Sequence, residues 1–364
     1  MILMNDFRAE PAALRQAMLA ATERVLASGW YVLGKECEAF EQRWASVCGV
    51  AHGVGVGNGM DAIEIALRAL DIGPGDEVIT TPMTAFATVL AVMRAGATPV
   101  LADIDAETAL LSQASVRRCL SSRTKAVVLV HLYGQLRDVA SWQELCRDAE
   151  VSLIEDCAQS HYARLGGRGA GSFGVAGAFS FYPTKNLGAA GDGGMLVTVD
   201  EAIASKAAML RNYGQRERYH HPLVGLNSRL DEVQAAMLSA RLAWMDEFNV
   251  RRRAIANAYF DGLHHAEVRL MAAPQEDAAH VHHLFVVTCA RRLELQAHLQ
   301  ASGVQSLIHY PVPVHRQPPC SELRIDPQGL AASEEHAATC LSLPCHPQLS
   351  NDEVQQVIDT VNRF

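Results

Sequence analysis

Apolar and amphipathic segments alternate along the chain between about residues 50 and 200. Each apolar segment has the length of one buried strand, and the segments between them are long enough for crossover helices, which is the pattern of an α/β sheet. Residues 61–70 carry apolar side chains at helical spacing and follow the capping residues Asn58 and Gly59, so a glycine-rich turn opens onto a helix there. The pattern predicts strands at residues 77–83, 98–104, 125–133, 151–157, 177–182 and 194–199.

The pattern becomes helical and charged from about residue 205 to 262, as expected for a bridge between two lobes. A chain of 364 residues also exceeds the size at which one hydrophobic core usually stops growing. We therefore expect a large domain at residues 1–245, with an N-terminal helical segment, and a small C-terminal α/β domain at residues 246–364. The strands and helices predicted for the end of the small domain are 282–289, 291–303, 305–312 and 351–364.

The composition is that of an ordinary globular protein, with 49% hydrophobic and 20% charged residues. Its apolar runs are shorter than the roughly 20 residues of a membrane span, and its N-terminus lacks the features of a secretory signal, so we expect a cytoplasmic protein without membrane contact. A formal net charge of −9 argues against nucleic-acid binding, which needs basic clusters. The nine cysteines include no CxxC pair, so we expect reduced thiols and no metal site.

Residues 169–174 read GAGSFG and match the G-x-G-x-x-G pattern of a dinucleotide-binding turn. Such a turn follows a strand and opens a helix. This one instead leads into residues 177–182, which have the pattern of a strand. We therefore reject a Rossmann-type site at this motif.

Three other segments carry groups that suit one kind of chemistry. The glycine-rich residues 53–60 precede the helix at 61–70, where free backbone N–H groups and the helix dipole favour a phosphate. The segment LIEDCAQSH (153–161) places acids at the end of a strand, where α/β proteins usually contact ligands. Lysine is rare in this chain, yet Lys185 lies in AFSFYPTKNLGAAGDGG (178–194), which is a poor setting for a merely solubilising charge.

Pyridoxal 5′-phosphate (PLP) chemistry needs these three groups together. A lysine amine forms a Schiff base with the PLP carbonyl, an acid such as Asp156 keeps the pyridine nitrogen protonated, and a helix N-terminus holds the phosphate. Each signal alone has a simpler explanation, because any glycine-rich turn can open a helix and an acid after a strand can cap one. Their order along the chain, with Lys185 about thirty residues after Asp156, favours the PLP interpretation.

Six longer motifs extend this pattern over the chain: GNGMDA, LIEDCAQSHYA, AFSFYPTKNLGAAGDGG, NSRLDEVQAAML, IHYPVPVHRQ and LPCHPQLS. Together they resemble the DegT/DnrJ group of PLP-dependent nucleotide-sugar aminotransferases. The resemblance covers about residues 28–360. It implies a fold-type I transferase, in which a large domain with a central, mostly parallel sheet is joined to a smaller C-terminal α/β domain.

The resemblance also implies a role for individual residues. Lys185 corresponds to the Schiff-base lysine and Asp156 to the partner of the pyridine nitrogen, so these two are the implied catalytic residues. Asn227 corresponds to an asparagine that reaches the neighbouring subunit's phosphate site, which implies a homodimer with shared active sites. The other implied cofactor-binding residues are Gly59, Met60, Gln159 and Ser180, with Gln159 at the ring's 3′-oxygen. The candidates for the sugar pocket, for which structural roles are the alternative, are His161, Tyr182, Arg229, His309 and Tyr310.

One position departs from the family's pattern. Family members usually carry an aromatic residue that stacks on the cofactor ring in a P-x-x-T-[FYW]-x-A-T stretch. This chain reads TPMTAFAT at residues 81–88 and has Ala85 at that position. Phe86 follows directly and is the candidate for the stacking contact.

The implied reaction moves the amino group of L-glutamate to a keto group of a nucleotide-linked deoxyhexose. NGMDA and YPTKNLGAAGDGG resemble members that act at C3 of the sugar, whereas members that act at C4 more often read SGT and GEGG there. A dTDP-3-keto-6-deoxyhexose is therefore favoured, with a 4-keto sugar or a UDP-linked 3-keto sugar as alternatives. In related sugar dehydratases histidine replaces the lysine, so Lys185 argues against dehydration. A PLP-binding regulator without turnover and a simple interaction domain are the remaining alternatives.

Overall fold

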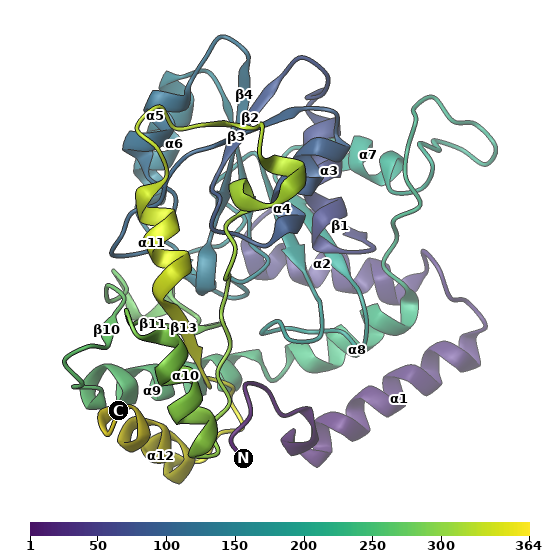
Figure 1. Ribbon diagram of the computed structural model, residues 1–364. Helices are drawn as coiled ribbons and strands as arrows, with labels where there is room; N and C mark the ends of the chain where they lie inside the picture. The colour runs from purple at the N-terminus through teal and green to yellow at the C-terminus, as the bar shows by residue number, and fades with distance from the viewer.

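The computed structural model describes residues 1–364 and arranges them in two lobes (Figure 1). The large lobe is built on an eight-stranded sheet with the order β1-β9-β8-β5-β4-β2-β3-β12. Strand β9 is antiparallel to both of its neighbours, and every other pair in the sheet is parallel. The strands are β1 (His52–Val56), β2 (Glu77–Thr80), β3 (Thr98–Leu101), β4 (Thr124–Val130), β5 (Ser152–Asp156), β8 (Ala176–Ser180), β9 (Gly194–Thr198) and β12 (Arg324–Ile325).

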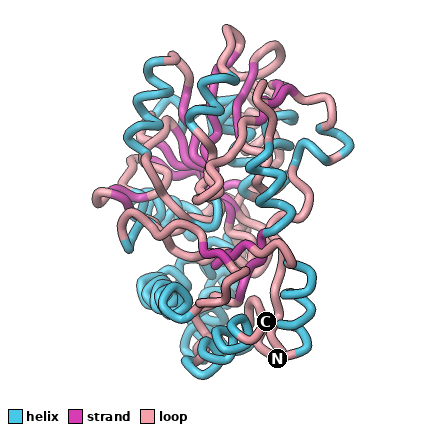
Figure 2. The backbone as a smooth tube through the Cα atoms, turned by 60° about the vertical axis from the view of Figure 1, so that its left-hand side comes forward, coloured by secondary structure: helices cyan, strands magenta, loops and turns pink.

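Helices cover both faces of this sheet, and Figure 2 shows the strands gathered between them. Side chains alternate between the faces along each strand, so Val78 and Ile79 of β2 belong to two different hydrophobic cores. Helices α3 (Gly59–Ala69), α4 (Phe86–Arg94) and α7 (Glu201–Leu210) pack in the core that contains Val78. Helices α2 (Lys35–Cys48), α5 (Gln113–Cys119) and α6 (Val139–Asp148) pack on the other face.

The small lobe is built on a three-stranded antiparallel sheet with the order β10-β11-β13. One hydrophobic core joins this sheet to helices α9, α10 and α12. Helices α1 and α8 pack against one another beside it. The three strands of this sheet are β10 (Arg269–Leu270), β11 (Phe285–Thr288) and β13 (Cys340–Leu343). The remaining helices are α1 (Ala12–Ser28), α8 (Glu232–Leu242), α9 (Met245–Gly262), α10 (Arg292–Ala301), α11 (Ala331–Thr339) and α12 (Asn351–Asn362). A small hairpin on the large lobe is formed by β6 (Arg164–Leu165) and β7 (Arg168–Gly169).

The predicted α/β fold with a central, mostly parallel sheet is confirmed, and each of the six strands predicted between residues 77 and 199 is present. The strand predicted at 305–312 is wrong, because only Leu307 forms an isolated bridge, to Ser342 of β13. Pro311 and Pro313 lack the N–H group that a strand must donate, which explains the break. The second strand beside β11 is instead β13, which follows α11.

Two segments pack on the other lobe from their neighbours in the chain. Residues 314–330, which follow the small lobe's α10, return to the large lobe, where β12 pairs with β3 at the edge of the sheet. Asp326 is buried there and accepts a hydrogen bond of 2.9 Å from Arg118 Nε of α5. At the other end of the chain, Ile2 pairs with Val304 and packs in the core of the small lobe.

All nine cysteines are buried, and none forms a disulfide. None of the helices combines the length and the apolar character that crossing a membrane requires.

Candidate active site

The candidate site lies at the carboxyl end of β5, where the strand ends in Asp156. This side chain is buried and accepts two hydrogen bonds: Thr88 Oγ1 donates to Oδ2 over 2.8 Å, and the Ala158 N–H donates to Oδ1 over 3.1 Å. Thr84 Oγ1 lies 2.8 Å from Thr88 Oγ1 and, because Thr88 already donates to Asp156, it is the donor of that bond. Both oxygens of Asp156 are therefore fixed in orientation.

Lys185 lies in the turn after β8, and its backbone N–H donates to the carbonyl of Tyr182 over 2.9 Å. The residue is half-buried. Burial lowers the pKa of Lys185 to about 8, although the charge of Asp156 acts in the opposite direction. A larger share of this amine is consequently unprotonated near neutral pH than in an exposed lysine. The structure thus brings together the two residues that the sequence singles out as catalytic.

The N-terminus of α3 lies against the end of β8. The Asn58 side chain accepts from the N–H of Asp61 over 2.9 Å, so the N–H groups of Gly59 and Met60 have no acceptor within the helix. A Cβ atom at Gly59 would lie 2.6 Å from Ser180 Cβ, which is why only glycine allows this approach. The arrangement places two backbone donors and one hydroxyl side by side, as an anion site at a helix N-terminus requires.

Gln159 connects this site to the segment that follows α10. The backbone N–H of Tyr133 donates to Gln159 Oε1 over 2.6 Å, so Gln159 Nε2 is the group that donates to the Tyr310 hydroxyl over 3.1 Å. Burial raises the pKa of Tyr310 to about 12, with a further contribution from Asp156. Burial also lowers the pKa of His309 to about 4, helped by Lys185, so His309 is neutral at pH 7. Both residues therefore reach the site from the C-terminal part of the chain.

The other predicted site residues lie further from this centre. His161 is fully buried among aromatic rings, with centroids 5.5 Å from Phe179 and 5.7 Å from Phe181. Burial lowers the pKa of His161 to about 3, and Lys185 lowers it further. Tyr182 is 52% exposed. His161 thus lies in a packed core behind the lysine turn, whereas Tyr182 faces solvent in the single subunit.

Phe86, the candidate for the stacking contact, is the first residue of α4. It packs on the large-lobe cluster formed by Val89, Leu101 and Val314. Thr88, two residues later on α4, is the residue that contacts Asp156. Residues two apart on a helix point in widely different directions, so Phe86 and Thr88 lie on different faces of α4, and the stacking contact of Phe86 stays a prediction.

Asn227 and Arg229 precede α8, on a segment that lies beside α3. Asn227 is exposed, while its neighbour Ser228 is buried and donates to Asp61 Oδ2 over 2.6 Å. Arg229 Nη1 donates to Asn212 Oδ1 over 3.0 Å, and its guanidinium lies 5.3 Å from the ring centre of Tyr213. Neither Asn227 nor Arg229 contacts Lys185 or Asp156 of its own subunit.

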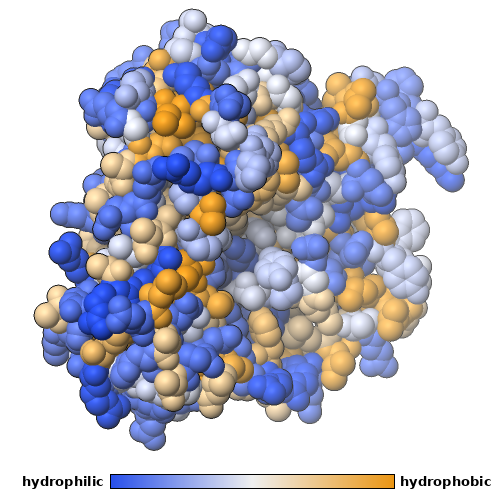
Figure 3. Space-filling view, viewed as in Figure 1, coloured by the Kyte–Doolittle hydropathy of each residue, from blue (hydrophilic) through white to orange (hydrophobic).

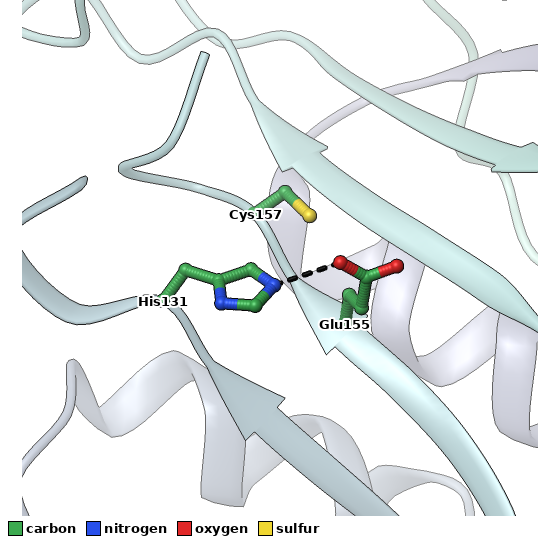
Figure 4. Close-up of side chains that lie close together, drawn as sticks. All are labelled: His131, Glu155 and Cys157. Carbon is green, nitrogen blue, oxygen red and sulfur yellow. Dashed lines mark hydrogen bonds and ion pairs between the residues drawn. The ribbon is translucent and has the colours of Figure 1, made fainter. Parts of the chain in front are cut away.

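A second polar cluster, formed by His131, Glu155 and Cys157, lies on the opposite face of β5 (Figure 4). His131 Nε2 donates to Glu155 over 2.8 Å, and the same carboxylate accepts from the N–H groups of three residues between 171 and 174. Burial acts to raise the pKa of Glu155, but these donors lower it. The glycine-rich motif at 169–174 therefore holds a carboxylate of its own chain, which explains its sequence without a dinucleotide.

Sequence reasoning missed the residues that position the site. Thr84 and Thr88 were within reach, since both belong to the TPMTAFAT motif at residues 81–88. Tyr133 could not be found, because its contact with Gln159 is made by the backbone. A hydrophobic pattern carries no signal for such a contact.

A comparison with family models supplies the assignment. The model described as the DegT/DnrJ/EryC1/StrS aminotransferase family matches residues 13–362, nearly the entire chain. The chain belongs to this family.

Several curated DegT/DnrJ relatives carry names that specify nucleotide sugars. The chain is 45% identical over 360 residues to a dTDP-3-amino-3,4,6-trideoxy-alpha-D-glucose transaminase of Streptomyces venezuelae, covering 99% of this chain and 95% of that protein. It is 41% identical over 363 residues to a UDP-N-acetyl-3-dehydro-alpha-D-glucosamine 3-aminotransferase of Acidithiobacillus ferrooxidans, covering 100% and 97%. This chain is accordingly a nucleotide-sugar aminotransferase.

Solved DegT/DnrJ structures agree with this assignment. S. venezuelae DesV, in complex with a ketimine intermediate, superposes with a TM-score of 0.96 at 44% identity, covering 100% of this chain and 98% of that one. Bacillus subtilis NtdA, with its bound cofactor PMP, has a TM-score of 0.89 at 26% identity, covering 98% and 83%. The cofactor is pyridoxal phosphate, and the residues present here fit it: an anion site, a buried carboxylate and an amine of lowered pKa.

Proposed function

We propose that this aminotransferase moves the amino group of L-glutamate to the keto group of a dTDP-linked 3-keto-6-deoxyhexose. The observation that carries the proposal is the half-buried amine of Lys185 beside the fixed carboxylate of Asp156. The S. venezuelae relative supports the sugar, because its name specifies a dTDP-linked 3-amino sugar. The A. ferrooxidans relative supports a UDP-linked 3-keto sugar as a second candidate.

Lys185 is the proposed nucleophile and proton carrier. When bound, pyridoxal phosphate supplies a carbonyl carbon for attack by an amine and a ring that withdraws electrons from the adjacent carbon. With a pKa of about 8, Lys185 would offer a neutral amine to that carbonyl carbon, and as a free amine it would serve as the base that takes a proton from one carbon and delivers it to another. The charge of Asp156 acts on this amine, so the two groups belong to one site.

Five other residues hold the cofactor in this proposal. Asp156 holds the proton on the ring nitrogen, because its two oxygens are kept in one orientation. Gln159 Nε2 has a second N–H group, beyond the one given to Tyr310, for the ring's 3′-oxygen. The N–H groups of Gly59 and Met60 and the hydroxyl of Ser180 bind the phosphate.

The active form in this proposal is a homodimer in which Asn227 completes the partner's phosphate site. Asn227 is exposed in the single subunit. It lies near the end of the loop between α7 and α8, which projects away from the large lobe (Figure 1). Large apolar side chains are also more than half exposed on and after α1, at Leu19, Leu26, Trp30 and Tyr31. In Figure 3 some orange residues lie on this side of the molecule, as others do elsewhere on the same face. A second subunit would cover the side chains on and after α1.

The test combines a substrate panel with one substitution. Purified protein with glutamate is assayed against 3-keto and 4-keto sugars linked to dTDP or UDP, and we expect amine transfer to be fastest with a dTDP-linked 3-keto sugar. Lys185→Ala should abolish transfer with every sugar, whereas Lys125→Ala, at an exposed lysine, should not change the rate. Borohydride reduction and peptide mapping should place the cofactor label on Lys185. A label on another lysine would overturn the residue assignment, and inactivity with the entire panel would overturn the function.

A further inference from the structure

Asn186, the residue after Lys185, is buried, and both ends of its side-chain amide are hydrogen-bonded. Its Nδ2 group donates to Asn249 Oδ1 over 3.0 Å and to the carbonyl of Val281 over 3.1 Å. Its Oδ1 atom lies 3.2 Å from His283 Nδ1. The turn that carries the lysine is therefore held, through its immediate neighbour, by Asn249 of α9 and by residues 281–283.

The direction of each of these hydrogen bonds is fixed by chemistry. The carbonyl of Val281 can only accept, so Nδ2 of Asn186 faces it and Oδ1 of Asn186 faces His283. His283 Nδ1 must then carry the proton that it donates. Burial lowers the pKa of His283 well below its usual value, with Lys185 adding to the effect, so this histidine remains neutral. Asn186 thus selects one tautomer of a neutral imidazole beside the lysine turn.

The inner face of α9 supplies two anchors one helical turn apart. Asn249 accepts from Asn186 and, through Nδ2, donates to the carbonyl of His161 over 3.3 Å. Arg252 donates to the carbonyls of Cys345 over 2.8 Å and of His282 over 3.2 Å. The buried amide of Asn249 thereby joins the lysine turn to the loop that begins after Asp156. A hydrophobic residue at this place could fill the volume but make neither bond.

We propose that Asn249 is a positioning residue for Lys185, which acts through Asn186 and fixes the lysine turn relative to the loop after Asp156. The proposal rests on the role of Lys185 proposed above. A group that carries a proton between two carbon atoms must be held within about 0.5 Å of its productive position. A misplacement of about 1 Å can lower a rate by roughly 10²-fold. Asn249 meets this need from a rigid helix and not from a loop.

The test compares Asn249→Ala with Asn257→Ala, an exposed asparagine two turns later on the same helix. Both variants are prepared as full-length protein with bound pyridoxal phosphate. For Asn249→Ala we expect kcat to fall about tenfold or more with KM for the sugar within about threefold, since the contact orients a reacting group and does not bind sugar. Visible circular dichroism per bound cofactor should fall about twofold or more, because a loosely held lysine no longer fixes one orientation of the chromophore. Asn257→Ala should match the native protein in both.

A purely structural role makes a different prediction. If Asn249 has only a structural role, Asn249→Ala lowers the midpoint of urea unfolding but leaves kcat and the visible dichroism of the folded, cofactor-loaded variant at native values. That outcome overturns the proposal. If Asn249→Ala does not fold, Asn249→Ser replaces it with the same criteria, since its shorter side chain keeps a polar group but cannot span both contacts. The dichroism does not depend on the sugar, so it still tests the proposal if the native protein transfers no amine to the panel.

Discussion

At the scale of single residues, two neighbouring acids on one strand differ in the sheet face that they occupy and in their hydrogen-bond partners. Asp156 and Glu155 are adjacent on β5, so their side chains point to opposite faces of the sheet. Glu155 is fully buried and engaged by His131 and by backbone N–H groups of the 171–174 loop. Asp156 is held by Thr88 and Ala158 at the strand's open end. Only Asp156 is placed to act on a ligand, although both lie in the same sequence motif.

Asp156→Asn should retain the cofactor but slow transamination. The amide that replaces the carboxylate cannot hold a ring proton by charge, and it places an N–H group against donors that need an acceptor. Loss of one preorganised electrostatic contact lowers kcat by roughly 10²- to 10³-fold. Single-turnover rates with glutamate measure this, with cofactor content determined by absorbance. A rate within about threefold of the native one would contradict the assigned role, because the contacts of Glu155 leave it unable to substitute.

At the scale of elements, the close packing of α3 against β8 forms the proposed phosphate site. Gly59→Ala would place a methyl group 2.6 Å from Ser180 Cβ, so the helix N-terminus must move outward. We expect the free energy of unfolding to fall by about 1–3 kcal/mol, as for other overpacked sites. The affinity for pyridoxal phosphate should fall as well, because the two N–H donors move with the helix.

Equilibrium dialysis with pyridoxal phosphate and urea unfolding measure the two effects of Gly59→Ala. Gly73→Ala is the matched control, since its added Cβ would have its nearest contact at 3.3 Å, with the carbonyl of Ala95. Native cofactor affinity in Gly59→Ala, with the expected loss of stability, would place the phosphate elsewhere.

Some strands could be predicted from the hydrophobic pattern of the sequence, and others could not. The strands between residues 77 and 199 were predictable because each is a buried apolar run between turns. Strand β1 was missed, since HGVGV has too few large apolar residues to stand out. Strand β12 has only two residues, and it exists because the chain returns to β3. No local pattern encodes such a long-range pairing.

At the scale of the whole molecule, the proposed shared sites predict complementation between two inactive variants. Lys185→Ala lacks the amine, and Asn227→Asp places a negative charge beside the partner's phosphate. In a mixed dimer one of the two sites combines a native lysine with a native asparagine, so activity should return to about one quarter of the native value if the chains exchange at random. Each variant alone is the control.

Subunit exchange is monitored by native mass spectrometry and activity by amine transfer. Mixtures that contain mixed dimers but remain inactive would contradict the shared-site model. A chain that stays monomeric at assay concentration and is active would contradict it as well.

The sequence by itself determined the layered α/β architecture and the family, and it singled out Lys185, Asp156, Gln159 and the turn at Gly59 as the candidate site. These features depend on local periodicity and on residue types at fixed spacing, which a sequence displays directly. Tertiary structure alone decided that Phe86 packs against Val89, Leu101 and Val314, that His161 is enclosed among aromatic rings, and that Asn249 bonds to the lysine turn through Asn186. Side-chain direction and the partner of a buried amide depend on segments far apart in the chain, and these meet only when the two lobes pack.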